Sequence, residues 1–178
     1  EERASRAPAA EAMLRGKMAS AESPAEKRSW FGTLRDVTVT PGGIDYLAAI
    51  WKSGTLPGTV SLSEDELSTL ALTMALKGHP EAGSIITRQR KRIAGRERLE
   101  RFDFVMPAVS ADTEVRDAFF ESLSDPASRE REPWVLEALG YLHHASVAER
   151  SEKYILPSLE MLEEIKATGD IFFPGSWI

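Results

Sequence analysis

The sequence contains no cysteine and only three histidines among its 178 residues. Without cysteine the chain has no disulfide, no thiolate ligand for zinc and no cysteine nucleophile. His79, His143 and His144 lack the H-E-x-x-H spacing, in which two histidines on one helix face bind zinc. The serine-elbow motif G-x-S-x-G, the P-loop and the G-x-G-x-x-G loop are absent as well. The sequence therefore predicts a chain without catalytic residues and without a metal site of its own.

Long apolar runs are also missing. No stretch approaches the roughly 18 residues of a membrane-spanning helix, and the first residues, EERASRAPAAEAML, have no apolar signal-peptide core. The net charge of −6 disfavours a general role on nucleic acid or anionic membranes. Apolar residues make up 42% and charged residues 28%, which is typical of a folded globular protein. None of these features identifies a compartment.

Helical periodicity is present almost everywhere, and strand-like alternation almost nowhere. In residues 63–77 the apolar side chains Leu67, Leu70, Ala71 and Met74 recur at helical spacing. Ser63 and Glu66 form a capping-box pattern at the start of this segment, and Gly78 stands where a helix would stop. We therefore expect one amphipathic helix with a buried stripe.

Similar signals divide the rest of the chain into helices. Ser23-Pro24 and Thr40-Pro41 predict helix starts, while Gly54, His79-Pro80, Gly95, Pro107 and Asp125-Pro126 predict breaks. A last helix is expected over 147–167, with Pro157 producing a kink or a broken start. Two of the buried faces that the spacing predicts are Val115, Phe119, Phe120 and Leu123, and Ile155, Leu159, Leu162 and Ile165.

The pattern as a whole predicts an all-α fold. Short antiparallel helices joined by Pro, Gly and Ser turns usually stack in pairs, so we expect an irregular α-solenoid of the degenerate HEAT-like kind. No linker is long enough to mark a boundary, and residues 1–178 are expected to form a single helical domain led by a helix within 1–29. Because the chain starts with Glu1 inside a helix-like segment, we expect it to be part of a longer polypeptide.

Two local features have both functional and structural interpretations. Adjacent helical residues point about 100° apart, so His143 and His144 cannot chelate one ion together. We expect them to be a helix-end pair whose polar groups contact carbonyls and solvent. The aromatic tail that contains Ile171, Phe172, Phe173 and Trp177 leaves the last helix as an extended segment. Its functional interpretation is an exposed binding patch, but we expect it to fold back onto the helices, since so much apolar surface rarely stays in water.

The basic stretch RQRKRIAGRERLER, residues 88–101, allows three interpretations. A solvated helix face with internal ion pairs is one. Nucleic-acid binding is a second and weaker one, because the stretch has no interleaved aromatic residues and the chain is acidic. The third is an anion site in which Arg92, Arg96, Arg98 and Arg101 hold the carboxylate end of a peptide, as arginine can do with two parallel hydrogen bonds.

Several blocks of the sequence resemble a known family. They are IWKSGTLPGTVSLSEDELSTLALTMAL (50–76), RFDFVMPAVSADTEVRDAFFESL (101–123), REREPWVLEALGYLHH (129–144) and KYILPSLEMLEEIKATGDIFFPGSWI (153–178). In this order they resemble the carboxy-terminal helical domain of bacterial membrane-alanyl-aminopeptidase-type enzymes, which are gluzincin zinc peptidases. The resemblance extends over about residues 30–178, and TGDIFFP is its most specific part. After the paired histidines relatives commonly have a Pro-Leu-Arg-like step, where this chain has Ala145, Ser146 and Val147.

The resemblance implies a parent enzyme that removes amino-terminal residues from peptides with a zinc-activated water. It implies a catalytic domain elsewhere in the same polypeptide, which would hold the zinc, and peptide substrates as further partners. No catalytic residue of the family falls within this chain. The expected role is therefore a non-catalytic cap that encloses the active-site cavity and controls access to it. The alternative is a stand-alone α-solenoid scaffold that binds protein segments.

Overall fold

The computed structural model describes residues 2–169 and 173–177 of the chain. Helices dominate these residues, which confirms the predicted all-α fold class. The chain forms two compact units, unit 1 with residues 1–93 and unit 2 with residues 94–178, and each is described by itself. The single domain and the solenoid stacking therefore stay predictions. No described helix has the length and apolar character that would let it cross a membrane.

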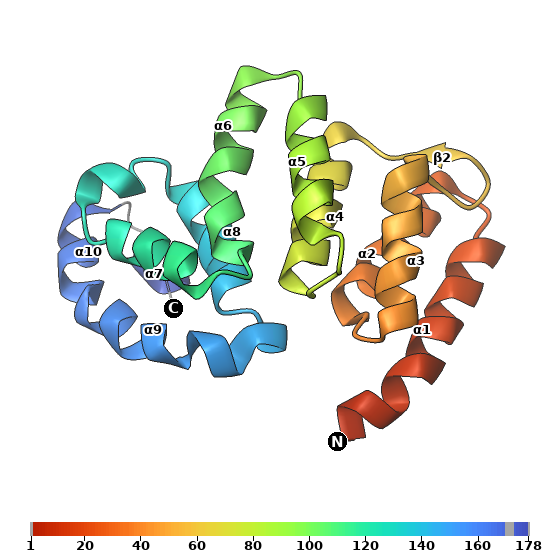
Figure 1. The fold of residues 1–178 in the computed structure, drawn as a ribbon, viewed down its shortest axis with the longest axis horizontal. Coiled ribbons are helices and arrows are strands. Elements are labelled where there is room, and N and C mark those ends of the chain that lie inside the picture. The colour runs from red at the N-terminus through yellow and green to blue at the C-terminus, as the bar shows by residue number, and fades with distance from the viewer. Residues whose placement is uncertain (1, 170–172, 178) are drawn as a thin grey trace. The chain divides into compact units, whose positions relative to one another are not determined.

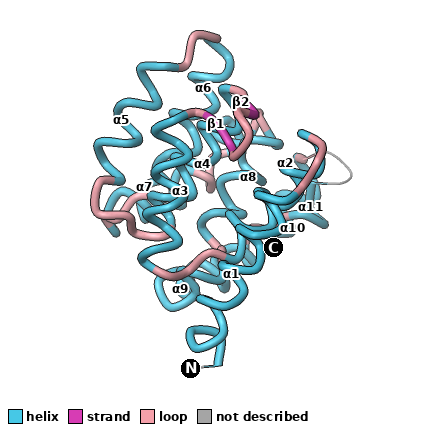
Figure 2. Tube along the Cα trace, turned by 90° about the vertical axis from the view of Figure 1, so that its right-hand side faces the viewer, coloured by secondary structure: helices cyan, strands magenta, loops and turns pink. Residues whose placement is uncertain are grey.

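Unit 1 consists mainly of helices joined by short turns (Figure 1). Helices α1 and α2 pack closely together, as do α4 and α5, and α3 packs on α4. Figure 2 shows the small two-stranded sheet of this unit among the helices. The elements are α1 (Glu2–Ser20), α2 (Pro24–Val37), α3 (Pro41–Ser53), β1 (Thr55–Leu56), β2 (Val60–Ser61), α4 (Glu64–Leu76) and α5 (Ala82–Arg92).

The predicted helix starts of unit 1 are confirmed. The Ser23 hydroxyl accepts a hydrogen bond from the backbone N–H of Glu26, and Thr40 caps α3 in the same way. At α4 the capping box is complete, because the Ser63 N–H also donates to the Glu66 carboxylate at 2.7 Å. These bonds satisfy amide groups that have no partner within the helix.

The core of unit 1 contains the side chains that the helical spacing placed inside. Leu70, Ala71 and Met74 of α4 are fully buried. Trp51 is buried beside them, and its indole N–H donates to Gln89 Oε1 at 2.9 Å, while Gln89 Nε2 donates to Ser68 Oγ at 3.1 Å. This buried chain of hydrogen bonds joins α3, α5 and α4, and each of its polar groups has a partner.

The short β-hairpin is an element that helical spacing does not predict. β1 and β2 pair antiparallel, with Thr55 opposite Ser61 and Leu56 opposite Val60. Gly58 and Thr59 between the strands both have positive φ values, 80° and 63°. Such left-handed backbone at two successive turn positions is typical of tight hairpins. Two residues per strand are too few for alternation to be visible in the sequence.

Unit 2 is built from helices and three short 3₁₀ turns (Figure 1). Helices α6 and α8 pack against each other, and η1 packs against both of them and against α7. The core contains Phe102, Val105, Leu123, Val135, Ala138 and Leu142. The elements are α6 (Arg96–Val105), η1 (Met106–Val109), α7 (Thr113–Ser122), η2 (Pro126–Arg129), α8 (Glu132–Leu142), η3 (Ala145–Val147), α9 (Ala148–Glu160), α10 (Leu162–Thr168) and α11 (Phe173–Ser176).

The predicted inward face of α9 is wrong. Ile155 and Leu159 are each 47% exposed, and the buried residues of this helix are Ser151, Tyr154 and Ser158. Tyr154 faces inward because its ring lies 4.7 Å from that of Phe120 and its hydroxyl donates to Asp117 at 2.5 Å. A neighbouring helical position points about 100° away, so burying Tyr154 turns Ile155 outward.

Two further expectations for unit 2 are corrected. Val115 is 42% exposed, although Phe119, Phe120 and Leu123 of the same predicted face are buried. Val115 lies in the first turn of α7, so the buried stripe of this helix begins one turn later than predicted, at Phe119. The break in the last predicted helix comes at Met161, four residues after Pro157, so α9 and α10 are separate helices.

The aromatic tail folds back onto unit 2, as expected for Phe173 and Trp177. Phe173 is 3% exposed and Trp177 is 1% exposed, and the Trp177 indole N–H donates to the Ser158 carbonyl at 3.0 Å. The expected extended conformation is wrong over Phe173–Ser176, which form α11. Ile171 and Phe172 lie outside the described residues.

Candidate functional site: two pockets and the basic stretch

The basic stretch 88–101 extends over the end of unit 1 and the start of unit 2. Arg88 and Arg92 of α5 lie over the ring of Trp51, with guanidinium carbons 5.3 and 4.6 Å from the ring centroid. A cation over an indole face is attracted by the ring quadrupole. Arg92 is therefore positioned by a cation–π contact on the surface of unit 1.

The other three predicted anion-site residues belong to α6. Arg96 is 93% exposed and pairs with Glu100 one turn later at 2.8 Å, which raises the pKa of its guanidinium. Arg98 is exposed and bends back over Gly95, where an added Cβ would be 2.9 Å from its Nη2 atom. Arg101 donates two hydrogen bonds to the Glu137 carboxylate, at 2.6 and 2.8 Å. Arg96 and Arg98 thus remain reachable from solvent, while Arg101 joins α6 to α8.

A groove of about 470 Å³ lies on unit 2. Its wall is aromatic, because Phe104 lies edge-on to Phe119 at 5.6 Å and tilted to Trp134 at 6.0 Å between ring centroids. Its rim is charged, and the Arg131 guanidinium lies 5.1 Å from the Trp134 ring centroid. The lining residues are Asp103, Phe104, Pro107, Phe119, Ser122, Ala127, Ser128, Glu130, Arg131 and Trp134.

Such a groove can bind an apolar or aromatic side chain beside polar groups. Aromatic side chains contribute large contact areas with few rotatable bonds, and they dominate the energetics of many interfaces. Ser122 together with the carboxylates of Asp103 and Glu130 supplies hydrogen-bonding groups at the same groove. These features are those expected of a surface that takes one residue of a peptide and contacts its backbone.

Sequence reasoning missed this groove. Phe104 and Trp134 are half-buried and lie 30 positions apart in the sequence. Neither lies in the buried stripe of its helix, which contains Phe102 and Val105 in α6 and Val135, Ala138 and Leu142 in α8. An aromatic residue outside a helical apolar stripe is the one sequence signal that could have singled them out. A large aromatic residue off the core face is a candidate for a binding surface.

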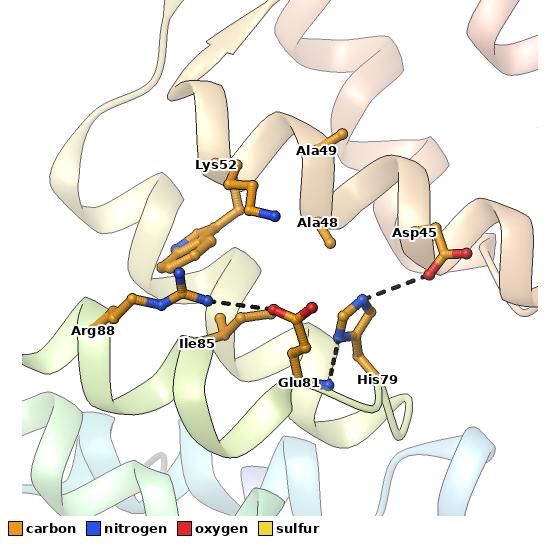
Figure 3. A pocket seen from close by; sticks show the side chains of 9 residues that line it. Asp45, Ala48, Ala49, Lys52, His79, Glu81, Ile85 and Arg88 are labelled. Carbon is orange, nitrogen blue, oxygen red and sulfur yellow. Dashed lines mark hydrogen bonds and ion pairs between the residues drawn. The ribbon is translucent and has the colours of Figure 1, made fainter.

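A second pocket, of about 240 Å³, lies within unit 1 between α3 and α5 (Figure 3). Asp45 and Lys52 come from α3, and His79, Glu81 and Arg88 come from the turn before α5 and from α5 itself. Ala48, Ala49, Ile85 and Trp51 also line this pocket. The His79 ring is fixed, because its Nδ1 accepts from the Glu81 backbone N–H at 3.0 Å and its Nε2 lies 3.6 Å from Asp45 Oδ1.

The paired histidines differ from each other. His144 caps η3, where its Nδ1 accepts from the Ser146 backbone N–H at 3.1 Å. The His143 ring meets the Tyr154 ring edge-on, and its buried Nε2 has no hydrogen-bond partner among the described residues. Burial lowers the pKa of His143. The expectation that both rings are satisfied by carbonyls and solvent is therefore wrong for His143.

The described residues contain no cluster of three or more His, Cys, Asp or Glu side chains able to hold a metal ion. No family model matches the chain, and no curated protein or solved structure matches it significantly.

Proposed function

We propose that this chain is the non-catalytic helical cap of a zinc-dependent aminopeptidase, which removes amino-terminal residues from peptides. In this role the chain forms walls of the cavity through which peptides reach a catalytic domain of the same polypeptide. The zinc and the residues that activate water belong to that catalytic domain. The cap contributes shape, contacts to the peptide and control of access.

The groove of unit 2 is the observation that carries this proposal. Eight of its ten lining residues fall within the blocks 101–123 and 129–144, which resemble the aminopeptidase domain. The two exceptions are Ala127 and Ser128. The segments that carry the resemblance thus build a surface suited to a peptide, and a cap domain needs such a surface.

The basic stretch supplies a second proposed contact. Arg92, Arg96, Arg98 and Arg101 are proposed to hold the far carboxylate of a peptide, and the exposed Arg96 and Arg98 are best placed to do so. The pair of Arg96 with Glu100 is a weak competitor, since an exposed pair one helical turn apart contributes little. Arg101 is less available, because its Nε and Nη2 groups both donate hydrogen bonds to the Glu137 carboxylate.

The groove is tested in the full-length enzyme with Trp134→Leu and Arg131→Ala. Both changes should raise KM for tripeptides and longer peptides by about tenfold, because they remove contacts to residues beyond the first. KM for a single-residue chromogenic amide should stay the same. Arg150→Ala, at an exposed position of α9 outside the groove, is the matched control. Equal KM changes for peptides and the amide would contradict this role of the groove.

The carboxylate contact has its own test. Removing the charges with Arg96→Met and Arg98→Met should raise KM for short free peptides more than for the same peptides with an amidated carboxyl end. Equal effects on the two substrate types would show that residues 88–101 form only a solvated helix face and do not bind the carboxylate. The two tests are independent, because the substitutions lie in different parts of unit 2.

A stand-alone protein-binding scaffold is the second candidate, and one observation favours it. Ile155, Leu156 and Leu159 of α9 are 47%, 64% and 47% exposed, so they form an apolar stripe on the surface. The coding sequence upstream of Glu1 separates the two candidates. The cap requires an H-E-x-x-H motif there, and the scaffold requires a start codon immediately before Glu1.

A further inference from the structure

The pocket of unit 1 has two ends of opposite charge. On α3, Asp45 precedes Lys52 by seven residues, and Arg88 of α5 follows Glu81, the residue before that helix, by the same interval. Seven residues are about two helical turns, or about 10 Å along the axis, so Asp45 and Lys52 lie on one face of α3. Asp45 lies toward one end of the pocket and Lys52 and Arg88 toward the other, and the Glu81 carboxylate lies between them, 3.5 Å from the Arg88 guanidinium (Figure 3).

The basic end has unused binding capacity. The Lys52 ammonium forms no hydrogen bond or ion pair with any described residue, and it reaches toward the space between the helices (Figure 3). The Arg88 guanidinium donates to the Ser84 carbonyl and hydroxyl, each at 3.2 Å, and contacts Glu81 at 3.5 Å, which is at the limit of a hydrogen bond. A ligand carboxylate between Lys52 and Arg88 would therefore compete with Glu81 for Arg88 and gain the Lys52 ammonium as a second partner.

The acidic end has fixed geometry. Because His79 Nδ1 accepts the Glu81 N–H, the neutral ring carries its proton on Nε2, which faces Asp45. The His79 side chain is 9% exposed, while the Asp45 carboxylate is 72% exposed and so can meet a second donor. A ligand ammonium can therefore bind at Asp45 without disturbing the turn that begins α5.

We propose that this pocket binds a short peptide of two or three small residues with both ends free. Its ammonium contacts Asp45, its carboxylate lies between Lys52 and Arg88, and its small side chains contact Ala48, Ala49 and Ile85. An extended dipeptide spans about 7 Å and a tripeptide about 10 Å, which is comparable to the helical rise of about 10 Å between Asp45 and Lys52. The volume of about 240 Å³ limits the side chains to small ones.

The same geometry disfavours other ligands. A free amino acid has its two charges on one carbon atom, so it cannot reach both ends. A phosphate or other ligand with negative charge alone would form no favourable contact at the Asp45 end of the pocket. A dipolar ligand is the one class that uses both ends. The site is built from unit 1 alone, and it does not depend on the proposed role of unit 2.

The test is titration of the 178-residue chain with dialanine and trialanine, followed by amide NMR shifts of α3 and α5. Because the charged groups at the pocket mouth are partly exposed, we expect a Kd of about 1 mM. N-acetyl-dialanine and dialanine amide, which each lack one charge, should bind at least about tenfold more weakly. Equal shifts with the blocked peptides, or no shift at about 10 mM dialanine, would overturn the proposal.

Two substitutions locate the site. Lys52→Met and Asp45→Asn should each weaken dialanine binding about tenfold, because each removes one charged contact. Lys91→Met, at an exposed position of α5 that does not line the pocket, is the control and should leave the Kd unchanged. If Lys91→Met weakened binding as much as Lys52→Met, the effect would be one of net charge and the proposed site would be wrong.

Discussion

The carboxylate of Glu11 on α1 holds the start of α3 through Thr40. One carboxylate oxygen accepts the backbone N–H groups of Val39 and Thr40, both at 2.9 Å, and the other accepts the Thr40 hydroxyl at 2.5 Å. Glu11 is 2% exposed, and Arg15 lies 3.5 Å away on the same helix. A buried carboxylate is stable only with such partners, so this contact fixes the position of α3, the helix that supplies Asp45 and Lys52.

Replacing Glu11 tests this contact. Glu11→Gln should lower the free energy of unfolding by about 1–3 kcal/mol, because an amide cannot accept all the hydrogen bonds that the carboxylate accepts. Urea unfolding followed by circular dichroism measures the change. The exposed Glu22→Gln is the control and should stay within about 0.5 kcal/mol of the parent. Equal losses for the two variants would show that Glu11 does not hold α3.

The same carboxylate predicts an acid dependence of stability. Burial pushes the pKa of Glu11 up, but the hydrogen bonds from Thr40 and Val39 and the charge of Arg15 outweigh it, so the pKa is lowered. A carboxyl with a lowered pKa stabilises the fold above its unfolded-state pKa, and this contribution disappears as the pH falls through the folded-state value. The stability difference between the parent and Glu11→Gln should therefore shrink below about pH 4. A difference independent of pH would contradict the assignment.

Gly42 and Gly43 are adjacent residues of α3 that differ in the space around them, so Gly42 serves as a control for a substitution at Gly43. An added Cβ at Gly43 would overlap the Glu11 carboxylate and come within 2.7 Å of Thr38 Cγ2, whereas Gly42 has nothing within 4 Å. Gly43→Ala should therefore destabilise unit 1 by about 1–3 kcal/mol through overpacking. Gly42→Ala should be neutral or stabilise by up to about 1 kcal/mol, since alanine favours helix. Thermal unfolding of both variants checks this, and similar melting temperatures would contradict the close approach of α1 to α3.

The contact between Arg101 and Glu137 predicts energetic coupling between α6 and α8. Their two short hydrogen bonds are partly buried, with the side chains 33% and 21% exposed. A double-mutant cycle with Arg101→Met and Glu137→Gln should give a coupling of about 1 kcal/mol in urea unfolding. The cycle for Arg96 and Glu100, which pair at the surface, should give a smaller coupling that salt abolishes. Additive effects of Arg101→Met and Glu137→Gln would show that the contact between Arg101 and Glu137 does not couple α6 to α8.

His143 predicts a loss of stability in mild acid. Its lowered pKa means that the unfolded chain takes up a proton more readily than the folded one, so stability falls as the pH drops below about 6.5. His143→Phe keeps an aromatic ring beside Tyr154 and removes the titrating group. The melting temperature of this variant should change less between pH 7.5 and pH 5.5 than that of the parent. Equal changes would show that His143 is not the group responsible.

The features that the sequence predicts well are helix starts and breaks, because these depend on residues that are close together in the sequence. Ser63 and Glu66 are three residues apart, and the capping box they form depends on nothing beyond the first turn of α4. The break between α5 and α6 follows from Gly95 in the same way.

What the sequence does not predict is decided by contacts between distant residues. The inward face of α9 depends on Tyr154 reaching Asp117 and Phe120, although the apolar spacing of Ile155 and Leu159 is equally helical. The groove combines Phe104 and Trp134 from separate helices. The pocket of unit 1 likewise requires the packing of α3 against the start of α5. Periodicity within one helix contains none of this information.

We propose that this chain is the cap of a zinc aminopeptidase and that the catalytic residues lie in another part of a longer polypeptide. Bound zinc and release of the amino-terminal residue from a peptide should be measured for the purified 178-residue chain and for the polypeptide that its complete gene encodes. Bound zinc and chelator-sensitive hydrolysis are expected in the longer polypeptide, and neither is expected in this chain. Hydrolysis by this chain alone, or a longer polypeptide without zinc and without hydrolysis, would contradict this proposal.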